Sequence, residues 1–237
     1  MTIKILTWNL WAQRYAKYPW NERLRIILEK IEETKPDILF FQEVEEEMRR
    51  DLVDELHLKY HDYHYTPKKD GADGILIISQ FYIDETSYLP LKGNQVATFA
   101  KIEGLMYIAV HLKSKKRNSD IRKEQLVAIL KEIIDPDKTV ILGDFNEDYG
   151  EGSIYKMLKG NGFDHVYDRE IKTTKKVDNE GTAVHRKIDW IWIPTYLKST
   201  SRPIISIDES ITLPDLEKGY PSDHHPICAE FDLDLVV

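Results

Sequence analysis

Residues 139–146 read Thr-Val-Ile-Leu-Gly-Asp-Phe-Asn, an apolar run that ends in a glycine, a carboxylate and an amide. A short, continuous run of aliphatic residues is typical of a strand buried on both faces. Asp144 and Asn146 follow directly at its end, a position from which side chains often carry function. Because Asp and Asn also form turns, the segment predicts a turn and a functional site together.

The same pattern, an apolar strand that ends in polar residues, recurs along the chain. Strands are predicted at 3–8, 38–41, 105–112, 187–193 and 227–235. The polar residues beside them are Asn9, Glu43, His111, Asp189, Asp223 and His224. Strand ends at one edge of a sheet face a common space, so we expect these side chains to converge. Carboxylate oxygens suit Mg²⁺ or Mn²⁺, and the set contains no thiolate, so it predicts an oxygen-ligated metal with acid–base groups for phosphoryl chemistry.

Four helices are predicted from apolar residues at helical spacing, at 21–34, 46–56, 119–134 and 153–158. Further strands are expected at 74–79, 82–89 and 95–102, with a hairpin turn at Glu103-Gly104. The polar segment Lys172–Val184 is expected to be a mobile loop. Without repeats or a linker, the pattern favours one α+β domain over residues 1–237, with helices covering packed sheets.

Composition limits the classes of function. The chain has 237 residues, a hydrophobic fraction of 42% and a net charge of −8, so it lacks the basic excess of domains that hold long nucleic acids. Basic residues do cluster locally, at 113–117 and 172–176. One cysteine, Cys228, cannot form an internal disulfide, which favours a reducing compartment. No signal-peptide pattern or bilayer-length apolar run occurs, so we expect a cytoplasmic monomer without membrane insertion.

Six segments resemble, in order, the motifs of the endonuclease/exonuclease/phosphatase superfamily. They are Thr7-Trp8-Asn9, Gln42-Glu43-Val44, His111-Leu112-Lys113-Ser114, Gly143-Asp144-Phe145-Asn146, Lys187-Ile188-Asp189-Trp190 and Ser222-Asp223-His224-His225-Pro226. That superfamily includes DNase I-like nucleases, abasic-site endonucleases, inositol polyphosphate 5-phosphatases, sphingomyelinases and tyrosyl-DNA phosphodiesterases. The resemblance covers essentially the whole chain. It implies a four-layer α/β-sandwich in which two mixed β-sheets pack face to face with helices outside.

The resemblance also implies roles at the site. Glu43 would be the principal Mg²⁺ ligand, with Asn9 and Asp223 near the same ion, and Mn²⁺ would be able to substitute.

Asp144 would orient or deprotonate the attacking water, and Asn146 would donate to the phosphate oxygens. His224, oriented by Asp189, would contact the scissile phosphate. His111 would be a second phosphate contact or the proton donor to the leaving oxygen.

Some residues retain a second interpretation from the sequence alone. Asp189 could instead pair with Lys187 or Arg186. The basic segment 113–117 could instead be a solvent-exposed face of the protein. Trp11 stands where abasic-site endonucleases commonly carry an acid, and His111 where they tend to carry Tyr, so the chain resembles the His-containing branch more closely. Selectivity is expected to come from loops at 60–72, 94–95, 113–120 and 172–184.

Three functions follow as hypotheses. The first is a Mg²⁺-dependent phosphodiesterase whose phosphate-ester substrate is DNA, RNA or a nucleotide derivative. The second is a phosphomonoesterase that acts on an inositol phosphate or another small phosphorylated metabolite. The third, ranked last because the motif carboxylates and His224 are all present, is a catalytically silent binding domain.

Overall fold

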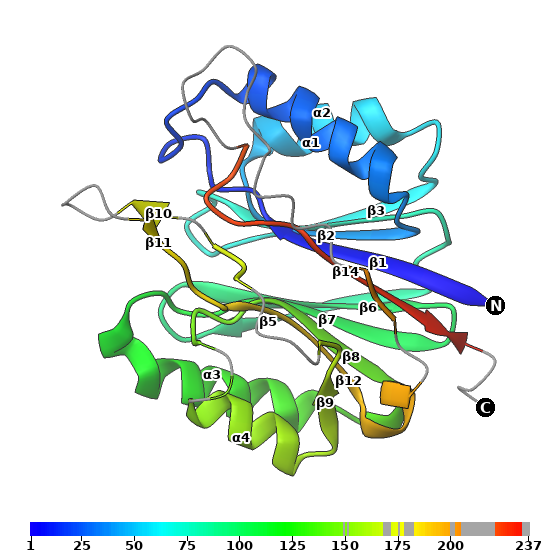
Figure 1. Cartoon of the computed structure of the whole chain (residues 1–237), viewed down its shortest axis with the longest axis vertical. Helices are drawn as coiled ribbons and strands as arrows, with labels where there is room; N and C mark the ends of the chain where they lie inside the picture. Colours follow the sequence, from blue (N-terminus) through cyan, green and yellow to red (C-terminus); the bar gives the residue numbers. More distant parts are fainter. Residues whose placement is uncertain are drawn as a thin grey trace.

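The computed structural model describes residues 1–148, 150, 152–167, 172–174, 176–177, 183–199, 202–204 and 221–233. Two six-stranded sheets pack face to face, and helices cover the outer face of each (Figure 1). Both sheets are mixed, because each contains one parallel strand pair among antiparallel ones. The expected four-layer α/β-sandwich is therefore confirmed.

The first sheet has the order β13-β14-β1-β2-β4-β3. Its strands are β13 (Arg202–Ile204), β14 (Ile227–Asp232), β1 (Thr2–Asn9), β2 (Ile38–Val44), β4 (Gly74–Ser79) and β3 (Asp62–Pro67). Helices α1 (Trp20–Thr34) and α2 (Glu46–Leu56) cover its outer face. Alternation along the strands decides the two faces: Phe41 packs with the helices, whereas Phe40 points into the space between the sheets.

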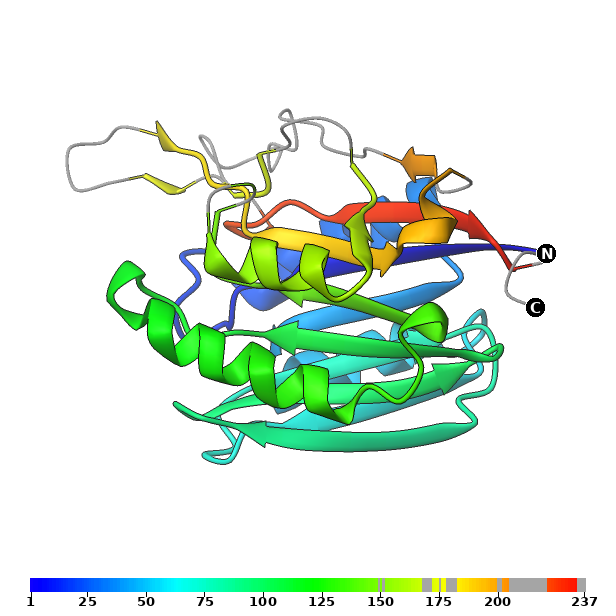
Figure 2. The same ribbon diagram turned by 90° about the horizontal axis from the view of Figure 1, so that it is seen from below.

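The second sheet has the order β5-β6-β7-β8-β12-β9. Its strands are β5 (Glu85–Leu91), β6 (Gln95–Ile102), β7 (Leu105–His111), β8 (Thr139–Asp144), β12 (Asp189–Pro194) and β9 (Phe163–His165). Helices α3 (Ser119–Glu132) and α4 (Ser153–Gly160) lie side by side on its outer face (Figure 2). Short 3₁₀ helices occupy Lys116–Asn118, Pro136–Lys138 and Thr195–Ser199, and β10 (Lys176–Val177) pairs with β11 (Ala183–Val184) as a separate hairpin.

The predicted turn at Glu103-Gly104 is confirmed. Both residues have positive φ, 48° and 78°, and they join the antiparallel strands β6 and β7. Left-handed conformations at both central positions are those that a tight two-residue hairpin requires.

Several elements differ from the sequence prediction. Residues 62–67, expected within a variable loop, form edge strand β3, whose alternating side chains are only partly buried and so give a weak apolar signal. Strand β5 starts at Glu85 rather than at residue 82. Residues 81–83 form a turn instead, in which Ser79 Oγ accepts a hydrogen bond from the Phe81 N–H and the Asp62 carboxylate accepts one from the Ile83 N–H. The short strands β9 and β13 were not predicted. Residues 175 and 178–182 of the expected mobile loop Lys172–Val184 fall outside the described residues, as does the end of the strand predicted at 227–235. The described part of that loop contains the paired strands β10 and β11.

Among the described residues, no helix is both long and apolar enough to cross a bilayer.

Candidate active site

Three neighbouring strands of the second sheet deliver three of the predicted site residues to one edge. Strand β7 runs parallel to β8 and ends at His111, which pairs in register with Asp144 at the end of β8. Strand β12 runs antiparallel to β8 and begins with Asp189, also in register with Asp144. Asp144 is therefore flanked by His111 on one side and Asp189 on the other, as the sheet register requires.

The first sheet supplies the facing half of the site. Parallel strands β1 and β2 place Asn9 beside Gln42, and Glu43 follows in a bulge where the pairing with β4 shifts register. His224 precedes β14, which runs antiparallel to β1, so it returns to the same end of the sandwich. This is the end opposite the amino terminus (Figures 1 and 2).

Three non-glycine residues of the site have left-handed backbone conformations, with φ of 57° at Trp11, 58° at Glu43 and 53° at Asn146. Such conformations cost about 1–3 kcal/mol each for residues with a Cβ, and they concentrate at functional positions. At Glu43 the conformation accompanies the bulge, which breaks the regular alternation of the strand. The carboxylate of Glu43 thereby lines the space between the two sheets' edges.

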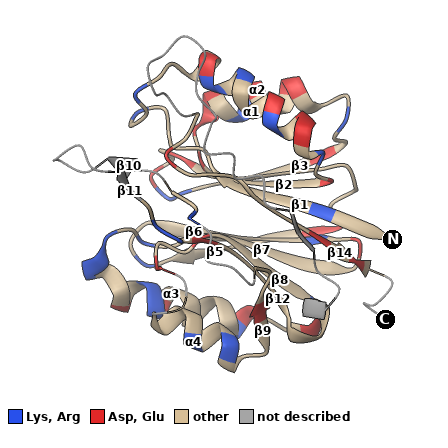
Figure 3. Cartoon of the chain, viewed as in Figure 1, with Lys and Arg blue, Asp and Glu red and all other residues tan. Residues whose placement is uncertain are grey.

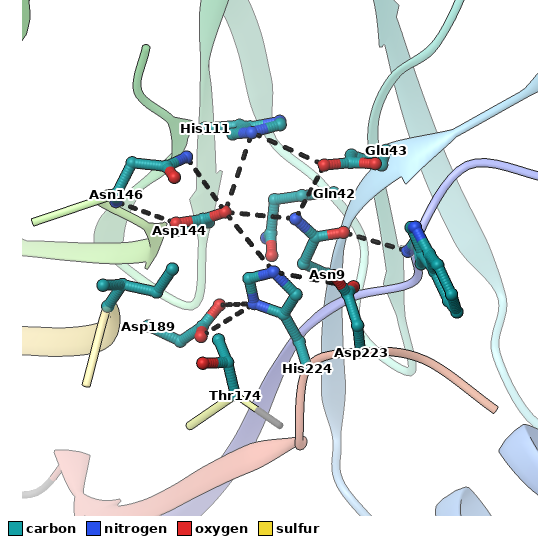
Figure 4. Close-up of polar contacts among 12 residues, drawn as sticks. Asn9, Gln42, Glu43, His111, Asp144, Asn146, Thr174, Asp189, Asp223 and His224 are labelled. Atoms are coloured by element: carbon teal, nitrogen blue, oxygen red, sulfur yellow. Dashed lines mark hydrogen bonds and ion pairs between the residues drawn. The ribbon is translucent and has the colours of Figure 1, made fainter. Parts of the chain in front are cut away.

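Asp144 is the centre of a hydrogen-bond network that joins the two sheets (Figure 4). Its Oδ2 accepts from Asn9 Nδ2 and from Asn146 Nδ2, each at 3.1 Å, and its Oδ1 accepts from the Asn146 backbone N–H at 2.8 Å. The same Asn9 amide donates to Glu43 Oε1 at 3.1 Å. Asn9 therefore holds the carboxylates of Glu43 and Asp144 beside each other, a role that sequence analysis did not anticipate.

The side-chain amides of Asn9 and Asn146 are engaged with protein groups. Asn146 Nδ2 donates to Asp144 and to the Leu112 carbonyl, so donation to a phosphate oxygen would require exchange of one of these bonds. The oxygen of Asn9 accepts from the Trp11 N–H at 2.9 Å and keeps a second lone pair.

His224 and Asp189 form a buried pair. His224 Nδ1 lies 2.9 and 3.0 Å from the two Asp189 oxygens, and Nε2 is left facing Asp144 Oδ2 at 3.9 Å and Asp223 Oδ1 at 3.8 Å (Figure 4). Of the two alternative partners for Asp189, Arg186 pairs instead with Asp148. Burial of the ring lowers the pKa of His224, but the charge of Asp189, followed by that of Asp223, outweighs burial and raises this pKa to about 10.

The two carboxylates of the network have opposite pKa shifts. Burial, followed by the charge of Asp189, raises the pKa of Asp144 to about 7. Burial also acts to raise the pKa of Glu43, but hydrogen bonds from Asn9 and the Ala12 N–H reverse the effect, so that pKa is lowered. The environment therefore favours the anion of Glu43 and makes Asp144 a better proton acceptor than an ordinary carboxylate.

Backbone anchors fix the His224 segment. Trp8 Nε1 donates to the His224 carbonyl at 2.9 Å, and Ser222 Oγ donates to the Asn9 carbonyl at 2.6 Å while accepting from the His224 N–H. The Thr173 hydroxyl accepts from the backbone N–H groups of both Ile188 and Asp189 at 3.0 Å. These anchors hold the pair from three segments. Thr173 carried no sequence signal, because a threonine in a polar segment has many ordinary uses.

His111 completes the site. Its Nε2 lies 3.7 Å from Glu43 Oε1 and 3.6 Å from Asp144 Oδ2, while Lys68 Nζ stands 3.5 Å from its Nδ1. Lys68 is itself held at 2.6 Å by the buried carboxylate of Asp73, which also pairs with Arg14. Sequence analysis did not predict Lys68, Asp73 or Arg14 as site residues. Lys68 follows edge strand β3, which the sequence analysis treated as a loop.

These residues surround a cleft of about 350 Å³, here called the acidic cleft. Its carboxylates are Glu43, Asp70, Asp73, Asp144 and Asp223, and its basic side chains are Arg14, Lys68 and Lys113. Trp11, Asn146, His111 and His224 also line it, whereas Asn9 and Asp189 stand behind as supports. All eight predicted site residues therefore gather at or directly behind one cleft.

The donor set of the acidic cleft fits a hard divalent cation. Its five carboxylates exceed its cations, the three basic side chains and the protonated His224, by one formal charge, so an added cation would favour the binding of a phosphate anion. The tightest grouping of ligand-type atoms within the described residues is Asp144, Asp189 and His224, within 4.8 Å of one another. There, however, His224 Nδ1 is already bonded to Asp189. Glu43, with its lowered pKa and its place in the lining, is better suited to hold the ion.

Comparison with known proteins agrees with this geometry. Residues 6–224 match the model of the endonuclease/exonuclease/phosphatase family, and the chain belongs to that family. The chain is 29% identical to nocturnin from Rattus norvegicus and 26% identical to nocturnin from Homo sapiens, in each case over 97% of its own length. It spans 65% of the length of these two relatives.

Solved structures share the fold. The human nocturnin catalytic domain with a bound sulfate anion has a TM-score of 0.78 at 22% identity, covering 98% of this chain and 94% of that one. ANGEL2, described as a 2′,3′-cyclic phosphatase in complex with adenosine-2′,3′-vanadate, has a TM-score of 0.77 at 16% identity, with 98% and 95% covered. D. rerio TDP2 complexed with a single-strand DNA product has a TM-score of 0.75 at 18% identity, with 98% and 99% covered.

Proposed function

We propose that the protein is a Mg²⁺-dependent phosphodiesterase that acts on nucleic acid ends or nucleotide-derived diesters. The observation that carries this proposal is the joining of the Asp144 network and the His224–Asp189 pair in one acidic cleft. Family membership supports phosphoric ester hydrolysis, and the relatives that bind DNA or an adenosine derivative support a nucleotide-like substrate.

The metal has a clear place in this proposal. Glu43 would hold Mg²⁺, with Asn9 and Asp223 beside it, and Mn²⁺ would substitute. When bound, the ion would supply the positive charge that the cleft lacks and stabilise charge on the phosphate and the leaving oxygen.

The protein's own groups then divide the work. Asp144 accepts the proton of the attacking water, a task that a carboxylate with a pKa near neutrality performs well. His224, kept protonated by Asp189, donates from Nε2 to a phosphate oxygen as charge builds up. His111 donates a second hydrogen bond or protonates the leaving oxygen. Asn146 holds Asp144 in orientation, and it would donate to the phosphate by exchanging its hydrogen bond to the Leu112 carbonyl.

A short or single-stranded substrate is favoured over a long duplex. Acidic and basic residues alternate on α1, α2 and α3, so these helices do not present one basic face (Figure 3). A long nucleic acid is normally held by such a face.

A substrate screen tests the proposal. Bis(p-nitrophenyl) phosphate and 5′-labelled and 3′-labelled oligonucleotides are incubated with the protein in Mg²⁺, in Mn²⁺ and in EDTA. We expect diester cleavage in either metal and none in EDTA. Release of inorganic phosphate from inositol phosphates or other monoesters, with the diesters left intact, would replace the proposal by a phosphomonoesterase. No turnover of any ester would leave a binding domain as the function.

A further inference from the structure

A second hollow of about 950 Å³ lies along the side of the sandwich, where edge strand β3 of one sheet faces β5 and β6 of the other. We call it the edge groove. The residues that line it include Tyr65, Pro67, Tyr88, Pro90, Leu91 and Val96. This volume is at the upper end of the range of small-molecule sites, about 300–1,000 Å³. Flat aromatic and proline surfaces of this kind suit a planar ring.

The edge groove adjoins the acidic cleft. Lys68, Asn94 and Gln95 line both. The two turns that separate them are tied together, because Asn94 Nδ2 donates to Asp70 Oδ2 at 2.5 Å. A molecule with its phosphate in the acidic cleft would reach the edge groove by passing beside Lys68 and over the Asn94–Asp70 contact.

Gln95 lies where the acidic cleft and the edge groove meet, and its side-chain amide oxygen lacks a hydrogen-bond donor among the described residues. Its side chain is 8% exposed, and its amide oxygen is buried without a hydrogen-bond partner among the described residues. A buried carbonyl without a donor is costly, and such groups call for a specific explanation. A donor on a ligand that bridges the cleft and the groove would satisfy it.

We propose that the edge groove binds the nucleoside that is esterified to the phosphate in the acidic cleft. The base stacks on the flat surfaces of Tyr88 and Pro90, and a sugar hydroxyl or base N–H donates to Gln95. A nucleoside fits better than an alkyl chain, because an alkyl chain would cover the same apolar walls but leave Gln95 unsatisfied. This inference rests on the proposed function and specifies its substrate class.

Two diesters with the same leaving group test the inference. Thymidine 5′-(p-nitrophenyl phosphate) and methyl p-nitrophenyl phosphate differ only in the group that remains on the phosphate. We expect wild-type kcat/KM to be at least tenfold higher for the thymidine ester, with the difference mainly in KM. Tyr88→Ala should reduce that ratio by about tenfold, because stacking of a base on an aromatic ring is commonly worth this much or more.

Tyr82→Ala is the matched control. Tyr82 is also an exposed tyrosine near β5, but it does not line the edge groove, so its variant should keep the wild-type ratio. Gln95→Leu should lower the ratio while the melting temperature stays equal or rises, because an unsatisfied buried oxygen is removed. A purely structural role of Gln95 would instead lower the melting temperature and leave the ratio unchanged.

The failure of this inference is distinguishable from failure of the proposed function. Cleavage of both esters with equal kcat/KM, unchanged in Tyr88→Ala, would overturn the nucleoside site and leave the phosphodiesterase intact. Cleavage of neither ester would overturn the proposed function. In that case, calorimetric titration with thymidine 5′-monophosphate and with inorganic phosphate tests the nucleoside site. Tighter binding of the nucleotide by the wild type, and loss of this difference in Tyr88→Ala, would support the site. Equal affinities of the wild type for the two ligands would overturn it.

Discussion

Nδ1 of His224 lies 2.9 Å from Oδ2 of Asp189, and both side chains are almost completely buried. The carboxylate fixes the ring and keeps the second nitrogen protonated toward the acidic cleft. Removal of the Asp189 carboxylate would leave the buried charge of His224 without its stabilising partner. We therefore expect the two residues to act as one unit.

Asp189→Asn tests that unit. Loss of the negative charge lowers the pKa of His224, so we expect kcat to fall by about 10²–10⁴-fold and the alkaline limb of the pH–rate profile to move to lower pH. Asp148→Asn is the matched control, since Asp148 pairs with Arg186 away from the acidic cleft. An unchanged pH profile in Asp189→Asn would contradict the assignment.

Asp144→Asn and His224→Ala are each expected to abolish measurable turnover, with a loss of about 10²–10⁴-fold or more, while the fold stays intact. The asparagine keeps the size of Asp144 and removes a buried charge beside Asp189 and Glu43. At pH 8 in EDTA, this gain is opposed by the loss of one acceptor oxygen of the network, so the free energy of unfolding of Asp144→Asn should differ from that of the wild type by no more than about 3 kcal/mol. Circular dichroism and urea unfolding measure the fold, and a large loss of stability would show that the lost activity reflects unfolding.

Glu43→Gln concerns the metal. The wild type should melt at a higher temperature in millimolar Mg²⁺ than in EDTA, because an ion that binds only the native state stabilises it. In Glu43→Gln this shift should shrink, and the Mg²⁺ concentration for half-maximal activity should rise by about tenfold or more. If the variant matches the wild type at limiting Mg²⁺, the ion is held elsewhere in the cleft.

The stability of the metal-free protein should depend on His224. The pKa of His224 is about 10 in the folded protein and 6.5 as a free side chain, so its stabilising contribution is complete below pH 6.5 and is lost as pH rises toward 10. In EDTA, the free energy of unfolding should fall by about 2 kcal/mol more between pH 6.5 and 8 in the wild type than in His224→Gln. Urea unfolding at both pH values measures this difference, and equal slopes would contradict it.

The sequence predicted the buried strands and their polar ends well, because both follow from local patterns. Strand β8 with Asp144 and strand β2 with Glu43 lie as expected, and so does the edge at which they meet. It also predicted the partnership of Asp189 with His224, although only through the resemblance to a family. The roles of these residues in catalysis stay predictions, as do the single domain over 1–237, the monomeric state and the cytoplasmic compartment.

What the sequence did not predict depends on contacts between segments that are distant in the chain. The bulge that turns Glu43 into the cleft follows from pairing with β4, and no local pattern encodes it. Lys68 is held by Asp73 in the same turn between β3 and β4, but its place beside the site depends on His111 at the end of β7 in the other sheet. The Arg23 side chain, buried in α1, donates to the Trp11 and Pro221 carbonyls, yet from sequence it reads as an ordinary surface arginine of a helix.

The side-chain amide of Asn9 in the first sheet donates a hydrogen bond to Asp144 in the second sheet. The site residues therefore come from both sheets, and their spacing depends on the distance between the sheets. The distance between the two sheets is set by interior side chains such as Phe40 and Tyr107, whose ring centroids lie 5.4 Å apart. Truncation of either ring would let the layers settle by a fraction of an ångström, and catalytic alignment tolerates little such error. Loss of a buried aromatic ring from this layer should thus destabilise the fold by about 3–5 kcal/mol and also slow turnover, and screens for loss of function would recover such variants together with active-site variants.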